Sequence, residues 1–172
     1  HKGKTIFVGD TSVHEYPNAK ELAEIATSSA RVVRLFGFDP KVAFVSHSTF
    51  GQPLTSRTKH IKDAVEILKE KNVNFEFDGD MQPDVALNKE YQSLYPFSKI
   101  VGNANILIMP GQHSAAISYK MMKTLGDTKV IGPLLIGLGL PIEIAPLRSS
   151  TSEILNLASI AAYSADVIDY KK

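Results

Sequence analysis

Cysteine is absent from this sequence of 172 residues. Its absence excludes disulfide bonds, thiolate metal sites and a cysteine nucleophile, and it fits the cytoplasmic location that we expect. The chain also lacks an excess of positive or negative charge, because its formal net charge is only +1. No overall field therefore favours nucleic acid or an anionic membrane. No apolar run is long enough to span a membrane, so we expect neither a nucleic-acid partner nor a membrane partner.

What is present fits one folded domain. Hydrophobic residues make up 44% of the chain and charged residues 22%, which is ordinary for a globular protein of this length. The chain begins with His1 rather than methionine, and we interpret it as a piece of a longer protein.

Strand and helix patterns alternate along the chain. The run ANILIMP is almost continuously apolar, which is typical of a strand in a sheet that is covered on both faces. Strands are predicted at 4–9, 41–46, 74–79 and 104–110, with one or two more within 129–147. Helices are predicted at 18–37, 58–71, 83–95, 114–126 and 151–170. The alternation predicts a three-layer α/β/α fold with a mostly parallel sheet of about five strands.

Ligands in such folds bind at the carboxyl ends of the strands. The segment SHSTFGQPLTSRTK, residues 46–59, follows one predicted strand, and the hydroxyls of Ser46, Ser48 and Thr49 could hold a phosphate there. The alternative is a solvated loop whose serines and threonines cap turns and a helix. Both interpretations stay open, although the glycines and the Gly-Lys-Ser/Thr ending of a P-loop are missing.

A cluster of acids follows the next strand, in FEFDGDMQPDVALN at residues 75–88. Asp78, Asp80 and Asp84 do not have the spacing of a calcium loop, and no paired histidines lie near them for zinc. Carboxylates at the start of a helix are favoured by its dipole in any case. We therefore expect no metal site here.

The third strand-to-helix turn, PGQHSAAISYK, contains His113. This histidine could be a base or a ligand contact, although a lone histidine in a turn is more often simply polar. No Ser-His-Asp order stands out and no GxGxxG follows a strand, so neither a hydrolase nor a dinucleotide site is supported. The residues alone thus predict an α/β domain with a polar rim that could bind phosphate.

The order of several motifs adds a resemblance to this prediction. The motifs are PNAKELAEIA, PKVAFVSHSTFG, DGDMQPDVA, NILIMP, ISYK and IGPLLIGLGLPIEI. Taken together they resemble the phosphate acetyltransferase/phosphate butyryltransferase family over essentially the whole chain. The resemblance implies a site for coenzyme A (CoA) or phosphate at Ser46, Ser48, Thr49, Asp78, Asp80, Gln82, His113, Arg148 and Glu153.

The segment before the last helix departs from the family. Active members carry S-R-G-C-S-x-x-D before the last helix, and the Ser-Arg pair is implicated in CoA binding and catalysis. Here the segment is PLRSSTSE, with Pro146 and Leu147 in place of that pair and Arg148 one position late. Glu153 stands in place of the aspartate. The resemblance therefore implies no catalytic residues and no transferase activity in this piece.

The phrase YPFSKIVGNANILIMP is similar to the phosphotransacetylase-like C-terminal domain of bacterial hybrid, NADP-dependent malic enzymes. This similarity implies that residues 1–150 form the second lobe of that domain and that residues 151–172 form a helix that packs on an absent first lobe. The implied function is acyl-CoA sensing and assembly of a homodimer, with acetyl-CoA or CoA as the effector and no cofactor in this piece. Malate oxidation, with NADP and a divalent metal, would lie in an absent N-terminal part. The alternatives are an active phosphate acetyl- or butyryltransferase and a pure assembly module.

Overall fold

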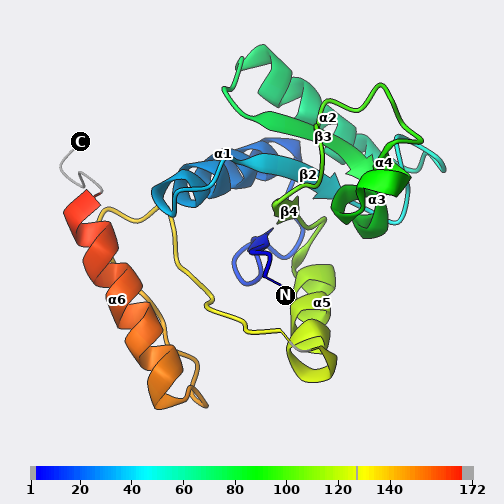
Figure 1. Ribbon diagram of the computed structural model, residues 1–172. Coiled ribbons are helices and arrows are strands. Elements are labelled where there is room, and N and C mark those ends of the chain that lie inside the picture. The colour runs from blue at the N-terminus through cyan, green and yellow to red at the C-terminus, as the bar shows by residue number, and fades with distance from the viewer. Residues whose placement is uncertain (1–2, 127, 168–172) are drawn as a thin grey trace.

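The computed structural model describes residues 3–126 and 128–167 (Figure 1). One parallel sheet, with strand order β1-β4-β2-β3, lies at its centre. The strands are β1 (Phe7–Gly9), β2 (Lys41–Val45), β3 (Glu76–Met81) and β4 (Ile106–Ile108). The prediction of an α/β fold with a mostly parallel sheet is confirmed, although the described residues form four strands rather than about five.

Helices cover both faces of the sheet. The helices are α1 (Ala19–Leu35), α2 (Ser56–Glu70), α3 (Pro83–Leu87), α4 (Lys89–Gln92), α5 (Gln112–Leu125) and α6 (Thr151–Val167). On one face, α1 and α2 pack on Val42, Phe44 and Ile106 of the central strands. On the other face, α3 and α5 pack on Ala43 and Leu107. Each strand thus alternates its side chains between two cores.

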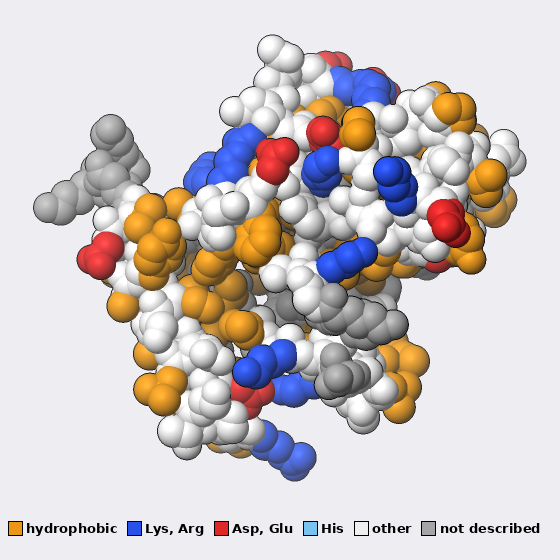
Figure 2. Space-filling model, viewed as in Figure 1, with side chains coloured by type: hydrophobic (Ala, Val, Ile, Leu, Met, Phe, Trp, Pro, Cys, Tyr) orange, Lys and Arg blue, Asp and Glu red, His pale blue; other side chains and the backbone are white. Residues whose placement is uncertain are grey.

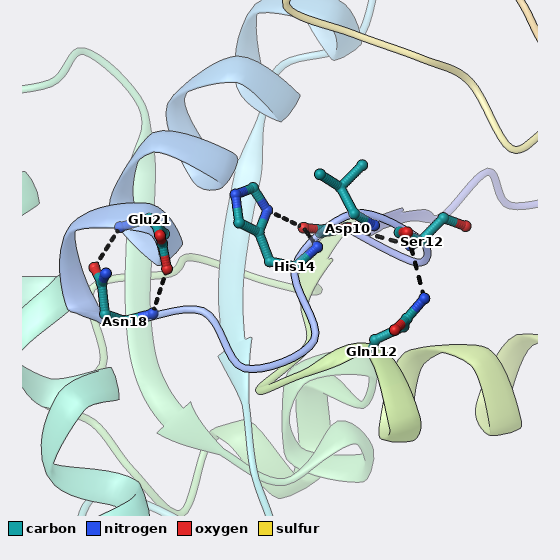
Figure 3. A network of polar contacts seen from close by, with 7 residues as sticks. Asp10, Ser12, His14, Asn18, Glu21 and Gln112 are labelled. Atoms are coloured by element: carbon teal, nitrogen blue, oxygen red, sulfur yellow. Dashed lines mark hydrogen bonds and ion pairs between the residues drawn. The ribbon is translucent and has the colours of Figure 1, made fainter.

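Local sequence sets the start of α1. The side chain of Asn18 accepts a hydrogen bond from the amide of Glu21 at 3.0 Å, and the Glu21 carboxylate accepts one from the amide of Asn18 at 2.8 Å. This reciprocal capping box satisfies two amides that the first turn of a helix leaves without partners. It places the first turn of α1 next to the loop that follows β1 (Figure 3).

Several predicted elements differ from the structure. The helix predicted at 83–95 is divided into α3 and α4, because Asn88 is extended and its side chain caps the amide of Glu90 at 2.9 Å. The described residues within 129–147 contain no strand, although one or two were predicted. Proline has no amide to donate to a ladder, and Pro133 and Pro141 interrupt this run. Strand β1 is also shorter than predicted, since it begins at Phe7.

The last helix, α6, lies to one side of the sheet (Figure 1). It starts at a capping box, in which the amide of Ser150 donates to the Glu153 carboxylate at 2.8 Å and the amide of Glu153 donates to the Ser150 hydroxyl at 3.3 Å. The hydroxyl of Tyr163 donates to the carbonyl of Leu35 at 3.0 Å, and Leu157 is buried, but Leu155 is 61% exposed. The division at residue 150 stays a prediction. No helix in the described part of the chain is long and apolar enough to cross a membrane.

Candidate ligand site at the carboxyl edge of the sheet

The four strands are parallel, so the loops that follow them meet at one edge of the sheet. The structure divides this edge into two polar clusters. One joins the loop after β2 to the end of β3, and the other joins the loop after β1 to the start of α5. Five of the nine predicted ligand residues fall in the first cluster, namely Ser46, Ser48, Thr49, Asp80 and Gln82.

Asp80 is the centre of the first cluster, and it is only 3% exposed. Its carboxylate accepts hydrogen bonds from the hydroxyl of Ser48 and, at 3.0 Å, from the amide of Gly51. Its carbonyl accepts a third bond from the amide of Phe50 at 2.6 Å. Asp80 therefore holds the loop after β2 in place from inside the protein.

A second set of bonds makes the two loops one unit. The hydroxyl of Thr49 accepts a bond from the amide of Gln82 at 3.2 Å, and the Gln82 side chain donates to the carbonyl of His47 at 3.1 Å. The amide of Ser46 donates to the carbonyl of Met81 at 2.9 Å. Ser46 and Gln82 remain partly exposed, whereas Ser48 and Thr49 are buried. Ser46 and Gln82 are thus the predicted residues of this cluster that a ligand can reach most directly.

Asp78 holds a different segment. Its carboxylate accepts the amide of Lys99 at 2.7 Å, and the carboxylate of Glu76, two residues earlier in β3, accepts the amide of Val101 at 2.8 Å. Both carboxylates thereby fix the chain that crosses from α4 towards β4. The glycine between the two aspartates is required by space, since a Cβ on Gly79 would lie 2.7 Å from the carbonyl oxygen of Phe44.

The second cluster is built around Asp10, directly after β1. Its carboxylate accepts the amides of Ser12 at 3.1 Å, Val13 at 2.8 Å and His14 at 2.9 Å, and it lies 2.5 Å from the imidazole Nδ1 of His14 (Figure 3). Burial alone would raise the pKa of Asp10, but the hydrogen bonds from Val13, His14 and Ser12 outweigh it, so the pKa lies below its ordinary value. Asp10 is therefore a carboxylate at neutral pH.

The same loop packs on the first residues of α5. The carbonyl of Glu15 accepts the amide of Gln112 at 3.1 Å, and the Gln112 side chain donates to the carbonyl of Ser12 at 3.3 Å (Figure 3). A Cβ on Gly111 would lie 2.8 Å from the Glu15 carbonyl oxygen, so this close approach requires glycine. The first amide of α5, which in other proteins can bind an anion, is occupied here by a carbonyl of the protein itself.

His113 follows in this helix and is exposed, with its ring 5.8 Å from that of Tyr16. It lies at the predicted edge of the sheet. Asp10, His14 and Gln112 were not among the predicted site residues. The position of Asp10 immediately after a strand is the signal that could have identified it.

The last two predicted residues lie elsewhere. Arg148 is exposed in the segment before α6, and Glu153 pairs with Lys123 at 2.7 Å. Lys123 lies near the end of α5, which is about 15 Å along the helix from His113 at a rise of about 1.5 Å per residue. The structure therefore does not bring Glu153 to the same end of α5 as His113.

The surroundings of Glu153 also determine its chemistry. The bond from Lys123, with those from Ser150, lowers the pKa of Glu153 to about 2. A carboxylate with such a pKa is a poor proton acceptor at neutral pH. Among the described residues, no group of three or more histidine or acidic side chains could hold a metal ion.

The fold and this edge define the chain as a parallel α/β domain with polar loops at the carboxyl ends of its strands. A profile of the family described as "Phosphate acetyl/butaryl transferase" matches residues 1–162, and the chain belongs to this family.

Two kinds of protein are similar to this chain. The NADP-dependent malic enzyme of Rhizobium meliloti is 46% identical over 164 residues, which are 95% of this chain and 22% of that protein. The phosphate acetyltransferase of Bacillus subtilis is 34% identical over 157 residues, which are 91% of this chain and 49% of that protein. The crystal structure of a phosphotransacetylase from Streptococcus pyogenes matches with a TM-score of 0.90 and 34% identity, over 96% of this chain and 50% of that one. The chain therefore spans about a fifth of the malic enzyme and about half of the transferases.

Proposed function

We propose that this chain is the phosphotransacetylase-like regulatory and assembly domain of an NADP-dependent malic enzyme. In this proposal it binds acetyl-CoA or CoA as an effector, and it transfers no acyl group. Malate oxidation belongs to a part of the protein outside this chain. Allosteric control requires only that the effector binds two states of the protein with different affinity.

The observation that carries the proposal is the state of the segment before α6. Acyl transfer between a thioester and phosphate needs donors for the carbonyl oxygen and a cation near the developing charge. Pro146 and Leu147 stand where the family has serine and arginine, and the Leu147 side chain is fully exposed. Neither side chain can donate a hydrogen bond. Glu153, in the position of the family's aspartate, is paired with Lys123 and has a pKa of about 2.

Ligand binding is supported by what the carboxyl edge retains. The loop after β2 and the end of β3 keep the family's hydroxyls and carboxylates, held by the internal bonds of Asp80 and Gln82. This leaves Ser46, Gln82 and the exposed His47 at the surface of a loop with a defined shape. A loop that is already ordered loses little entropy when a ligand binds.

The test is made on the full-length protein that contains this chain. Malate oxidation is measured with increasing acetyl-CoA, and acetyl-CoA formation from CoA and acetyl phosphate is measured separately. We expect acetyl-CoA to change the rate of malate oxidation and expect no transfer above background. Transfer at enzymatic rates would replace the proposal with the second candidate, an active phosphate acetyl- or butyryltransferase, which is favoured by the likeness to the Streptococcus pyogenes structure.

A double variant locates the site. Pro146→Ser with Leu147→Arg restores the family's pair, and we expect it to change CoA affinity because it adds a hydroxyl and a cation. The matched control is Met122→Ser with Leu125→Arg, which adds the same two groups at exposed positions near the end of α5, outside the family motifs. Unchanged CoA affinity in the first variant, or an equal change in the control, would show that CoA does not bind beside residues 146 and 147.

A further inference from the structure

A tight turn at Thr49–Gln52 holds a bulky residue in an unfavourable conformation. The amide of Gln52 donates to the carbonyl of Thr49 at 3.1 Å, and the two residues between them have positive φ, 49° at Phe50 and 80° at Gly51. Positive φ at both central positions is the pattern of a type I′ turn, which favours asparagine or glycine at the first. A phenylalanine there is strained, and the three bonds to Asp80 hold it in that conformation.

The turn brings the ring of Phe50 onto two other rings. Its centroid lies 5.5 Å from that of Tyr95 and 4.8 Å from that of Phe97, and these two are 6.1 Å apart. We call Phe50, Tyr95 and Phe97 the aromatic cluster. Tyr95 and Phe97 lie in the segment after α4, which passes beside the loop after β2 (Figure 1).

The aromatic cluster is open to solvent. Phe97 is 64% exposed, and Leu54 and Leu94, which lie three or four residues from members of the cluster along the chain, are 68% and 73% exposed. Hydrophobic side chains lie at the surface on this side of the molecule (Figure 2). An aromatic ring that only packs in the core is shielded from solvent by other side chains. Phe97 is not shielded in this way, so its exposed surface is available to a ligand.

We propose that the aromatic cluster binds the purine base of a nucleotide-containing ligand, with the base stacked on Phe97. The proposal rests on the proposed function, in which the ligand is CoA, whose adenine this surface would take. A planar base gains by stacking on an aromatic ring regardless of its hydrogen-bonding pattern. The cluster contains no charge, which suits a base rather than a phosphate.

Position connects the aromatic cluster to the candidate site. Phe50 lies between Thr49, which is bonded to Gln82, and Gly51, which is bonded to Asp80. One loop thus carries both the polar surface at Ser46 and His47 and the ring at Phe50. A ligand with a base at one end and polar groups along its length can contact both. Asp80 is a positioning residue in this arrangement, because it is buried and acts through Phe50.

The test uses Phe97→Leu, which removes the ring at an exposed position and should leave the fold intact. Binding of CoA and of 4′-phosphopantetheine, which lacks the adenosine, is measured by calorimetry on the full-length protein with NADP saturating. We expect Phe97→Leu to weaken CoA binding about tenfold, as loss of one stacked base would. We expect no change for 4′-phosphopantetheine, and recovery of CoA binding in Phe97→Tyr. Phe38→Leu, at a ring that is 41% exposed and packs on Phe7, is the matched control.

The outcomes separate the two proposals. If the wild-type protein binds no CoA, the proposed function fails and this inference fails with it. If the wild-type binds CoA and Phe97→Leu binds it equally well, only the aromatic cluster is wrongly assigned. If Phe97→Leu weakens CoA and 4′-phosphopantetheine to the same extent, the ring does not contact the base, and the inference is overturned. If the variant instead changes the sedimentation coefficient without changing CoA affinity, the cluster is a protein interface and the inference is again overturned.

Discussion

The hydroxyl of Ser48 donates a hydrogen bond to the buried carboxylate of Asp80, across 32 residues of sequence. Both side chains were predicted to bind a ligand, and both are engaged with each other. The carboxylate also accepts the amide of Gly51, so its two oxygens have separate donors. At this point the carboxyl edge of the sheet is therefore held together from inside the protein, and the partly exposed Ser46 and Gln82 lie around it.

Replacing Asp80 should therefore destabilise the protein even without a ligand. In Asp80→Asn only one oxygen can accept, so Ser48 or Gly51 is left without its acceptor in a buried place. We expect a loss of about 2 kcal/mol in the free energy of unfolding, measured by urea denaturation. The control is Asp84→Asn, since Asp84 is exposed and accepts the amide of its neighbour Val85. A stable Asp80→Asn would mean that the carboxylate is not needed to hold the loop.

The close approach of Gly111 to Glu15 gives a second prediction. The Cβ in Gly111→Ala would meet a backbone oxygen at 2.8 Å, so the loop after β1 must move away from α5. We expect a loss of about 1–3 kcal/mol in stability and faster hydrogen exchange at residues 12–16. Gly139→Ala is the control, because no atom lies within 4 Å of its added Cβ. Equal effects of the two substitutions would contradict the structure.

The contact between α5 and α6 should depend on pH. Glu153 has its pKa lowered from 4.5 to about 2 by its bonds to Lys123 and Ser150, so its charged form favours the folded contact. That contribution is fully present above pH 4.5 and is lost as pH falls through about 2. As pH falls below 4, the backbone amides in the first turns of α6 should therefore lose protection. Their hydrogen exchange should become faster relative to the intrinsic rate of an unfolded peptide at the same pH. Lys123→Met should weaken this dependence, whereas Lys120→Met, which leaves the pair of Lys123 and Glu153 intact, should not change it.

Apolar side chains on the segment between α5 and α6 lead us to expect a two-fold dimer. Leu140 is 64% exposed and Ile144 is 59% exposed, within a run that forms no strand among the described residues. Two-fold contacts are the commonest closed assembly, and an aspartate in such an interface costs too much to be tolerated. Leu140→Asp should shift the protein towards monomer in sedimentation velocity at micromolar concentration, whereas Leu54→Asp, at a residue equally exposed elsewhere, should not. A wild-type monomer at that concentration would contradict the expectation.

Sequence by itself determined the elements and the edge where a site could lie. The apolar runs of the central strands, the capping boxes of Asn18 with Glu21 and of Ser150 with Glu153, and the alternation of elements are local patterns. Each acts over a few residues, so each can be recognised in the chain alone. Parallel strands then place their following loops together, which is why Ser46, Asp78 and Gln82 could be predicted to gather.

Only the tertiary structure decided what those polar groups do. The hydrogen-bond partners of Asp78 and Asp80 are Lys99, Ser48 and Gly51, which lie 21 to 32 residues away, and no local pattern encodes them. The segment 129–147 had the composition of a strand, but a strand forms only when another strand pairs with it, and none does among the described residues. The strained turn at Phe50 could not be predicted from the sequence for the same reason. The hydrogen bonds to Asp80 hold it in a conformation that the local sequence disfavours.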